Sequence, residues 1–116
     1  MNVSVIVTTY NRPKALIKVL SGLAHQIRFA DEVIVADDGS LQETAAVLKA
    51  AAKEFPCPLV HAWHPDTGFR AAKIRNEAIR RSDGDYIVLL DGDCIPNRHF
   101  LKDHIQLARK GCFFQG

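Results

Sequence analysis

The sequence predicts an α/β fold, with a Rossmann-like, mainly parallel sheet and helices on both faces, in a single domain of 116 residues. Three observations support this prediction. Short apolar runs rich in β-branched residues alternate with segments of helical periodicity along the chain. Most of these runs end in polar or acidic residues, as strands do at the ligand-binding edge of such a sheet. The alternation of strand and helix also favours right-handed crossovers between parallel strands.

Five strands are expected. Residues 3–7, Val-Ser-Val-Ile-Val, give a strong signal because they are β-branched and nearly continuous. Residues 33–36 form the second strand, and residues 59–64 form a third in which histidines interrupt the alternation. Residues 86–90 are apolar throughout and indicate a strand that is buried on both faces. Residues 112–116 begin what looks like a further strand.

Four helices are expected between these strands, each from an apolar stripe at helical spacing. Residues 13–25 begin with a proline, which is favoured at the first helical position. The second helix, residues 42–55, follows a capping-box pattern of Ser40 and Glu43 and has Ala46, Val47, Ala50 and Ala51 inward. The third opens at Phe69 or Arg70 and runs through Arg81, and the fourth follows an N-cap at Asn97 and ends at Lys110-Gly111.

Composition excludes several classes of protein. The net charge of +2 is too small to favour a nucleic acid partner. No apolar run approaches the roughly 18 residues of a transmembrane helix, and residues 1–5 indicate a strand rather than a signal peptide. The cysteines at 57, 94 and 112 have no paired spacing, which favours reduced thiols. We expect a cytoplasmic domain, free or peripheral at the inner face of the membrane.

Polar residues gather after three of the strands, in Thr8-Thr9-Tyr10-Asn11, Asp37-Asp38-Gly39-Ser40 and Asp91-Gly92-Asp93. The carboxyl ends of parallel strands share one edge of the sheet, so these side chains should meet there. An Asp-Gly pair alone is also ordinary turn chemistry. Three coincident clusters favour a binding site over separate surface turns.

The pair Asp91 and Asp93 suits a metal ion. In an extended backbone, side chains two residues apart point to the same side, and Gly92 lets the chain bend between them. Two convergent carboxylates fit a hard divalent cation. Repulsion among the carboxylates requires nearby cations, which the third helix offers in Arg70, Lys73 and Arg75.

A nucleotide is the ligand that these residues suit. The glycine-rich dinucleotide and P-loop patterns are absent from the sequence, so phosphates would have to bind through a metal and through Arg or Lys. Tyr10 offers an aromatic surface for a base. Asp37 or Asp38 could accept a hydrogen bond from a base N–H or a ribose hydroxyl. Together these features fit a nucleoside diphosphate held by a divalent cation.

The pattern resembles the nucleotide-sugar-binding portion of family 2 glycosyltransferases, which have the GT-A fold. Four blocks in the right order support the resemblance: residues 3–12, 32–40, 68–76 and 84–93. It implies that residues 1–116 bind a UDP-sugar donor for transfer, with inversion, to a glycan or lipid-linked acceptor in cell-surface polysaccharide synthesis. It also implies a GT-A domain truncated after its D-x-D half, with the catalytic base expected beyond Gly116 and little turnover by this chain alone.

The resemblance also implies roles for individual residues. Nucleotide contacts are implied for Thr8, Tyr10, Asp37, Asp38, Arg70 and Asp91, and metal ligation for Asp93. Within this set, Asp38 would accept the base N–H, Asp37 would help to shape the loop, and Arg70 would reach the base or the phosphates. Asp91 would face the ribose, and Asp93 would bind Mg²⁺ or Mn²⁺.

Two other classes of protein remain as alternatives. A nucleotidyltransferase uses a similar sheet, but it would want a glycine-rich, basic first loop, which residues 8–12 do not provide. A non-catalytic, receiver-like domain would hold Mg²⁺ with an acidic pair after its first strand, where this chain has threonines. Both alternatives fit the sequence less well than the transferase.

Overall fold

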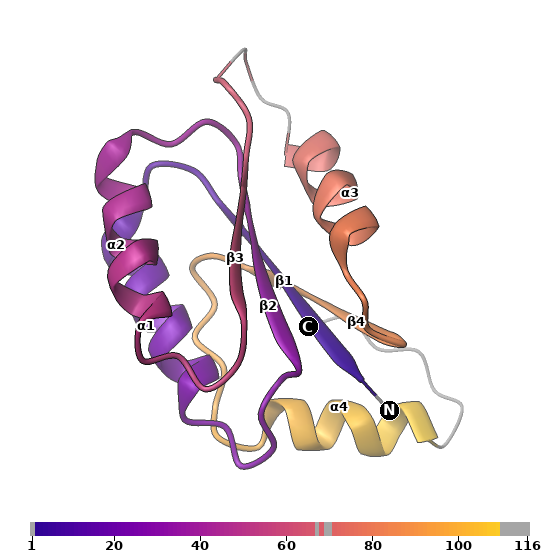
Figure 1. Cartoon of the computed structure of the whole chain (residues 1–116). Coiled ribbons are helices and arrows are strands. Elements are labelled where there is room, and N and C mark those ends of the chain that lie inside the picture. The colour runs from indigo at the N-terminus through magenta and orange to yellow at the C-terminus, as the bar shows by residue number, and fades with distance from the viewer. Residues whose placement is uncertain (1, 67, 69–70, 110–116) are drawn as a thin grey trace.

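The computed structural model describes residues 2–66, 68 and 71–109. Four parallel strands form one sheet in the order β3-β2-β1-β4, which confirms the predicted α/β class (Figure 1). The strands are β1 (Val3–Thr9), β2 (Glu32–Asp37), β3 (Leu59–Trp63) and β4 (Tyr86–Asp91). The further strand expected at residues 112–116 lies outside the described residues.

Helices follow all four strands at the predicted places. They are α1 (Pro13–Ala24), α2 (Gln42–Ala52), α3 (Ala71–Arg81) and α4 (Phe100–Arg109). α2 ends three residues earlier than predicted, because Lys53 is its C-cap and Phe55 already packs against the core. No helix in the described part of the chain is long and apolar enough to cross a membrane.

The predicted capping box of α2 is wrong. Leu41 is the N-cap residue and provides no side-chain cap. The hydroxyl of Ser40 instead accepts a hydrogen bond from the backbone N–H of Asn11 at 2.7 Å. The side-chain oxygen of Asn11 in turn accepts from the N–H of Leu41 at 2.8 Å. This exchange ties the loop after β1 to the start of α2.

The predicted inward face of α2 is also only partly right. Thr44 and Leu48 are the buried residues of this helix, whereas Ala46 and Ala50 are exposed. An alanine-rich helix has a weak apolar stripe, so its orientation follows the one large apolar side chain that gains most from burial. In α2 that side chain is Leu48.

The sheet is covered on both faces, as predicted (Figure 1). Alternate residues of β1 point to opposite faces. Val3, Val5 and Val7 belong to a core cluster that includes residues of α1, α2 and α4. Ile6 belongs to a second, smaller cluster, to which α3 contributes Ile74 and Ala78. Each large side chain buried in this way contributes about 1.5–3 kcal/mol through the hydrophobic effect.

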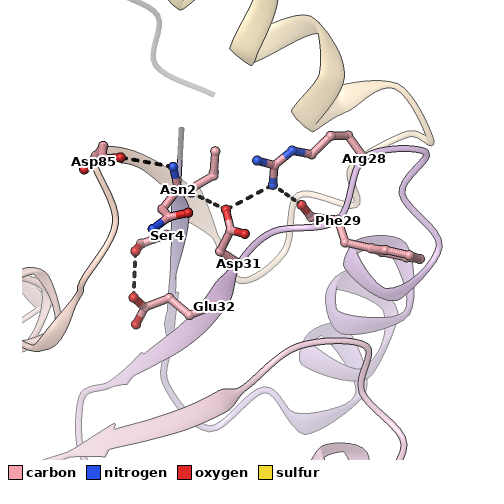
Figure 2. A network of polar contacts seen from close by, with 8 residues as sticks. Asn2, Ser4, Arg28, Phe29, Asp31, Glu32 and Asp85 are labelled. Carbon is pink, nitrogen blue, oxygen red and sulfur yellow. Dashed lines mark hydrogen bonds and ion pairs between the residues drawn. The ribbon is translucent and has the colours of Figure 1, made fainter.

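Side chains at the amino ends of the strands hold the register (Figure 2). Asp31 accepts a hydrogen bond from the backbone N–H of Val3 at 2.6 Å and one from Arg28 at 3.2 Å. The bond from the Val3 N–H holds the pKa of the Asp31 carboxyl below its usual value. Glu32 accepts from the hydroxyl of Ser4 at 2.9 Å. These bonds align β1 with β2, and so they also determine which residues meet at the opposite edge.

The register brings the polar strand ends together at the carboxyl edge. Thr9 lies opposite Asp37 across the β1–β2 pair. Thr8 lies opposite Asp91 across the β1–β4 pair. Three segments that are far apart in the sequence therefore end side by side.

Candidate functional site

A cavity of about 570 Å³ opens at this carboxyl edge. Its volume falls within the range of small-molecule sites, about 300–1,000 Å³. Its wall is built from the ends of β1, β2 and β4 and from one side of α3: Thr8, Thr9, Tyr10, Arg12, Ala36, Asp38, Ala72, Ile74, Arg75, Asp91, Gly92 and Asp93. Of the seven site residues predicted from the sequence, five line the cavity.

The end of β1 contributes an aromatic ring to the cavity. Tyr10 is 45% exposed, and its hydroxyl donates a hydrogen bond to Oδ2 of Asp66 at 2.6 Å. This bond raises the pKa of the Tyr10 phenol and lowers the pKa of the Asp66 carboxyl. Beside Tyr10, the buried hydroxyl of Thr9 has no hydrogen-bond partner among the described residues.

The two aspartates after β2 have different environments. Asp37 is fully buried: one oxygen accepts from the N–H of Ser40 at 2.9 Å, and the other lies 2.7 Å from Nε2 of His61. Asp37 does not line the cavity, so its contacts shape the loop. Asp38 does line the cavity, and its Oδ1 lies 2.5 Å from Nε2 of His64.

The loop after β2 is held closely by the chain that leaves β3. Nε1 of Trp63 donates to the carbonyl oxygen of Ser40 at 3.1 Å. Gly39 has a φ of +83°, and a Cβ built on it would lie 2.4 Å from the backbone nitrogen of Asp66. Glycine is therefore needed at this position both for the backbone conformation and for the close approach.

At the end of β4, both aspartates of the D-x-D pair line the cavity. Asp91 and Asp93 are both exposed. Thr8 Oγ1 lies 3.5 Å from Oδ1 of Asp91, and Nη1 of Arg12 lies 3.8 Å from Oδ2 of Asp93. An ion pair as exposed as Arg12–Asp93 contributes little to stability. A cation could therefore displace it at low cost.

The donor set at this end fits a hard divalent cation. Ligand atoms of Asp91, Asp93 and Cys94 all lie within 4.8 Å of one another. The two carboxylates supply the oxygen ligands that Mg²⁺ and Mn²⁺ prefer. Desolvation and the neighbouring Asp93 and Asp91 raise the pKa of the Cys94 thiol. A sulfur ligand also suits softer metals than Mg²⁺ and Mn²⁺.

Two arginines, Arg12 and Arg75, line the cavity. Arg75 is half-buried and makes no hydrogen bond or ion pair with any other residue that the structure describes. Arg12 approaches Asp93, as above. Arg70, the arginine predicted to contact the nucleotide, lies outside the described residues. Lys73 is exposed on α3 and does not line the cavity.

Sequence reasoning assigned no site role to two residues that the structure brings to this edge, Arg12 and His64. Arg12 lies two positions after Tyr10, and His64 directly follows β3. Each stands just after the carboxyl end of a strand. That position is the signal that could have identified them.

Comparison with known proteins gives a consistent result. Residues 4–114 match the family described as glycosyl transferase family 2. The chain is 34% identical over 106 residues to hyaluronan synthase of Pasteurella multocida, a match that covers 90% of this chain and 11% of that protein. It is 30% identical over 105 residues to the poly(ribitol-phosphate) β-N-acetylglucosaminyltransferase TarS of Staphylococcus aureus, covering 89% of this chain and 18% of TarS. The chain thus spans less than a fifth of the length of either relative.

Solved structures share the fold. TarS residues 1–349 in complex with UDP-GlcNAc superpose with a TM-score of 0.81 at 30% identity, over 95% of this chain and 32% of that one. The mannosyltransferase PcManGT from Pyrobaculum calidifontis, in complex with GDP-Man and Mn²⁺, gives a TM-score of 0.81 at 27% identity, over 92% and 32% of the two chains. The arrangement of β1, β2, β4 and α3 around the cavity is therefore that of a GT-A fold.

Proposed function

This chain belongs to glycosyltransferase family 2, and from that premise we propose that its cavity binds the UDP-sugar donor of a sugar transfer reaction with the help of a divalent cation. One observation supports this proposal above the others. The aromatic ring of Tyr10 and the carboxylate of Asp38 line the same cavity as the carboxylate pair Asp91 and Asp93. Nucleoside diphosphates need both kinds of site.

The base would bind at the end formed by β1 and β2. Tyr10 offers its ring for stacking, and Thr8 lies beside it. Asp38 would accept the ring N–H of uracil, because an ionised carboxylate accepts hydrogen bonds and donates none. Asp37 would act indirectly, since its buried carboxylate holds the backbone of Ser40.

The diphosphate would bind at the end formed by β4. Asp93 would be a ligand of Mg²⁺ or Mn²⁺, and Asp91, beside the hydroxyl of Thr8, would face the ribose. A bound cation would neutralise the charge that develops on the departing nucleoside diphosphate. The role that sequence analysis gives to Arg70 stays a prediction.

The acceptor side of the reaction is proposed from the relatives. Hyaluronan synthase and a poly(ribitol-phosphate) transferase are named for glycan and polymer products. By analogy with these relatives, the acceptor would be a glycan or a lipid-linked sugar, and the transfer would proceed with inversion. The reaction would contribute to the synthesis of a cell-surface polysaccharide. The residues proposed for this chain all concern binding of the donor.

Calorimetric titration with UDP, in the presence and absence of Mn²⁺, tests the proposal. We expect binding that requires the metal and that is lost in Asp93→Ala. Asp103→Ala is the matched control, because Asp103 is an exposed carboxylate on α4 that does not line the cavity. It should bind UDP as the wild type does. If the wild-type chain bound no nucleotide with or without metal, the proposal would be wrong.

A further inference from the structure

The chain that leaves β3 contacts both residues that would meet the base. His64 lies against Asp38, and Asp66 lies against Tyr10. Neither His64 nor Asp66 lines the cavity. They are therefore placed to orient the base-binding residues rather than to touch a ligand, and the inference below rests on the proposed function.

His64 holds the Asp38 carboxylate from behind. Their closest atoms are 2.5 Å apart, and the two side chains are 18% and 6% exposed. A carboxylate this buried is costly unless it is hydrogen-bonded. Because an ionised carboxylate only accepts, Nε2 of His64 is the donor of this bond. The backbone N–H of His64 also donates to the carbonyl oxygen of Asp37 at 3.4 Å, which ties the backbone of His64 to the end of β2.

Asp66 holds the ring of Tyr10 by a bond of 2.6 Å to its hydroxyl. Asp66 is itself placed by two neighbours. Its Oδ1 accepts from the N–H of Gly68 at 3.3 Å, and its backbone lies directly over Gly39. The tyrosine ring is thus tethered at its far end, while its face remains partly exposed at the cavity.

We propose that His64 and Asp66 are positioning residues of the nucleotide pocket, with His64 setting its preference for a pyrimidine that carries a ring N–H and Asp66 setting the stacking surface for any base. Uracil presents an N–H at the ring position where cytosine presents a lone pair. A carboxylate held in one orientation accepts from the first and repels the second. Without the His64 donor, the carboxylate is held less firmly in that orientation and loses part of the discrimination. Stacking on Tyr10 does not depend on the pattern of donors.

The two contacts therefore predict different signatures for UDP and CDP. His64→Leu keeps the approximate size of the side chain but removes the donor. UDP affinity should fall roughly tenfold, the effect of about one charge-assisted hydrogen bond, with little change for CDP. His64→Gln retains an N–H donor and should restore most of the UDP preference. Asp66→Ala should weaken UDP and CDP by the same factor, and Asp66→Asn, which keeps an acceptor for the Tyr10 hydroxyl, should weaken them less.

Calorimetric titrations of the full chain with UDP and with CDP, at one pH and at saturating Mn²⁺, measure these ratios. A lower ratio of UDP to CDP affinity in His64→Leu, its recovery in His64→Gln, and an unchanged ratio in Asp66→Ala support the proposal. A wild-type ratio in His64→Leu, or an equal loss in the Leu and Gln variants, would show that His64 only supports the fold. A changed ratio in Asp66→Ala would overturn the role given to Asp66.

The wild-type chain separates this inference from the proposed function. If the wild type binds neither nucleotide, the proposed function fails and with it the premise of the inference. If the wild type binds UDP with metal and His64→Leu keeps the wild-type ratio of UDP to CDP affinity, the inference alone fails. Thermal unfolding of each variant identifies any loss of binding that comes from a loss of folded protein, and the conservative Gln and Asn variants then decide the outcome.

Discussion

The α-carbon of Gly92 faces the carbonyl oxygen of Thr8 so closely that a Cβ there would lie 2.3 Å from that oxygen. Contacts of this kind force one of the two backbones to move. Because Gly92 lies between Asp91 and Asp93, any such movement would displace the carboxylate pair from the end of β1. The middle position of the D-x-D pair therefore has a strict steric requirement in this chain.

We expect Gly92→Ala to weaken metal-dependent UDP binding by roughly 5- to 150-fold, since a clash with backbone costs about 1–3 kcal/mol and acts where the ligands lie. Calorimetric titration with UDP and Mn²⁺ measures the loss. Ile95→Ala, three positions along, shortens an exposed side chain that does not line the cavity, and it should bind as the wild type does. Normal binding by Gly92→Ala would show that the end of β4 can shift without consequence.

A comparison of Gly39→Ala with Gly68→Ala separates the cost of backbone strain from the cost of steric crowding. Gly39→Ala forces an alanine into a φ of +83° and against the backbone of Asp66. Gly68→Ala has a similar φ of +101°, but among the described residues no atom lies within 4 Å of the new Cβ. Both variants should lose about 1 kcal/mol of stability from backbone strain, and Gly39→Ala should lose about 1–3 kcal/mol more. Urea unfolding measures both. Equal losses would mean that the Asp66 backbone yields easily.

The bond between Tyr10 and Asp66 predicts a pH dependence at both ends of the scale. It raises the pKa of the phenol, so its stabilisation is present below the ordinary tyrosine pKa and is lost as the pH rises through the raised value. It lowers the pKa of Asp66, so that contribution is present above the ordinary aspartate pKa and is lost as the pH falls through the lowered value.

An ultraviolet titration of the tyrosines tests this bond without any ligand. The chain has two tyrosines, so a Tyr86→Phe background leaves Tyr10 as the only one. In that background, Asp66→Ala should lower the pKa of Tyr10 toward its ordinary value. A pKa that does not move would contradict the contact on which the role of Asp66 depends.

Most of the fold could be predicted because its signals are local. The β-branched runs of β1 and β2, the proline at the start of α1 and the acidic turn after β4 each lie within a few residues of the structure that they specify. Because parallel strands align their carboxyl ends, the sequence also indicated that Thr8, Asp38 and Asp91 would share one cavity.

Contacts between segments that are distant in the chain could not be predicted from the sequence. Ser40 fits the pattern of a helix N-cap. Its hydroxyl instead accepts a hydrogen bond from the backbone N–H of Asn11, 29 residues away. His61 and His64 seemed only to interrupt a strand, yet each bonds one of the two aspartates that follow β2. A side chain with several possible partners is assigned to one of them only when the chain folds, because distance and burial then decide which bond forms.

By itself, the sequence determined that this protein has an alternating α/β fold and that polar residues end three neighbouring strands. Periodicity and strand-end chemistry are properties of short stretches, so they can be read without the rest of the chain. Only the tertiary structure decided that Asp37 is buried against Ser40 and His61 while Asp38 lines the cavity. The two aspartates are neighbours of the same type, and their environments differ because folding brings Ser40 and His61 to Asp37 and brings His64 to Asp38.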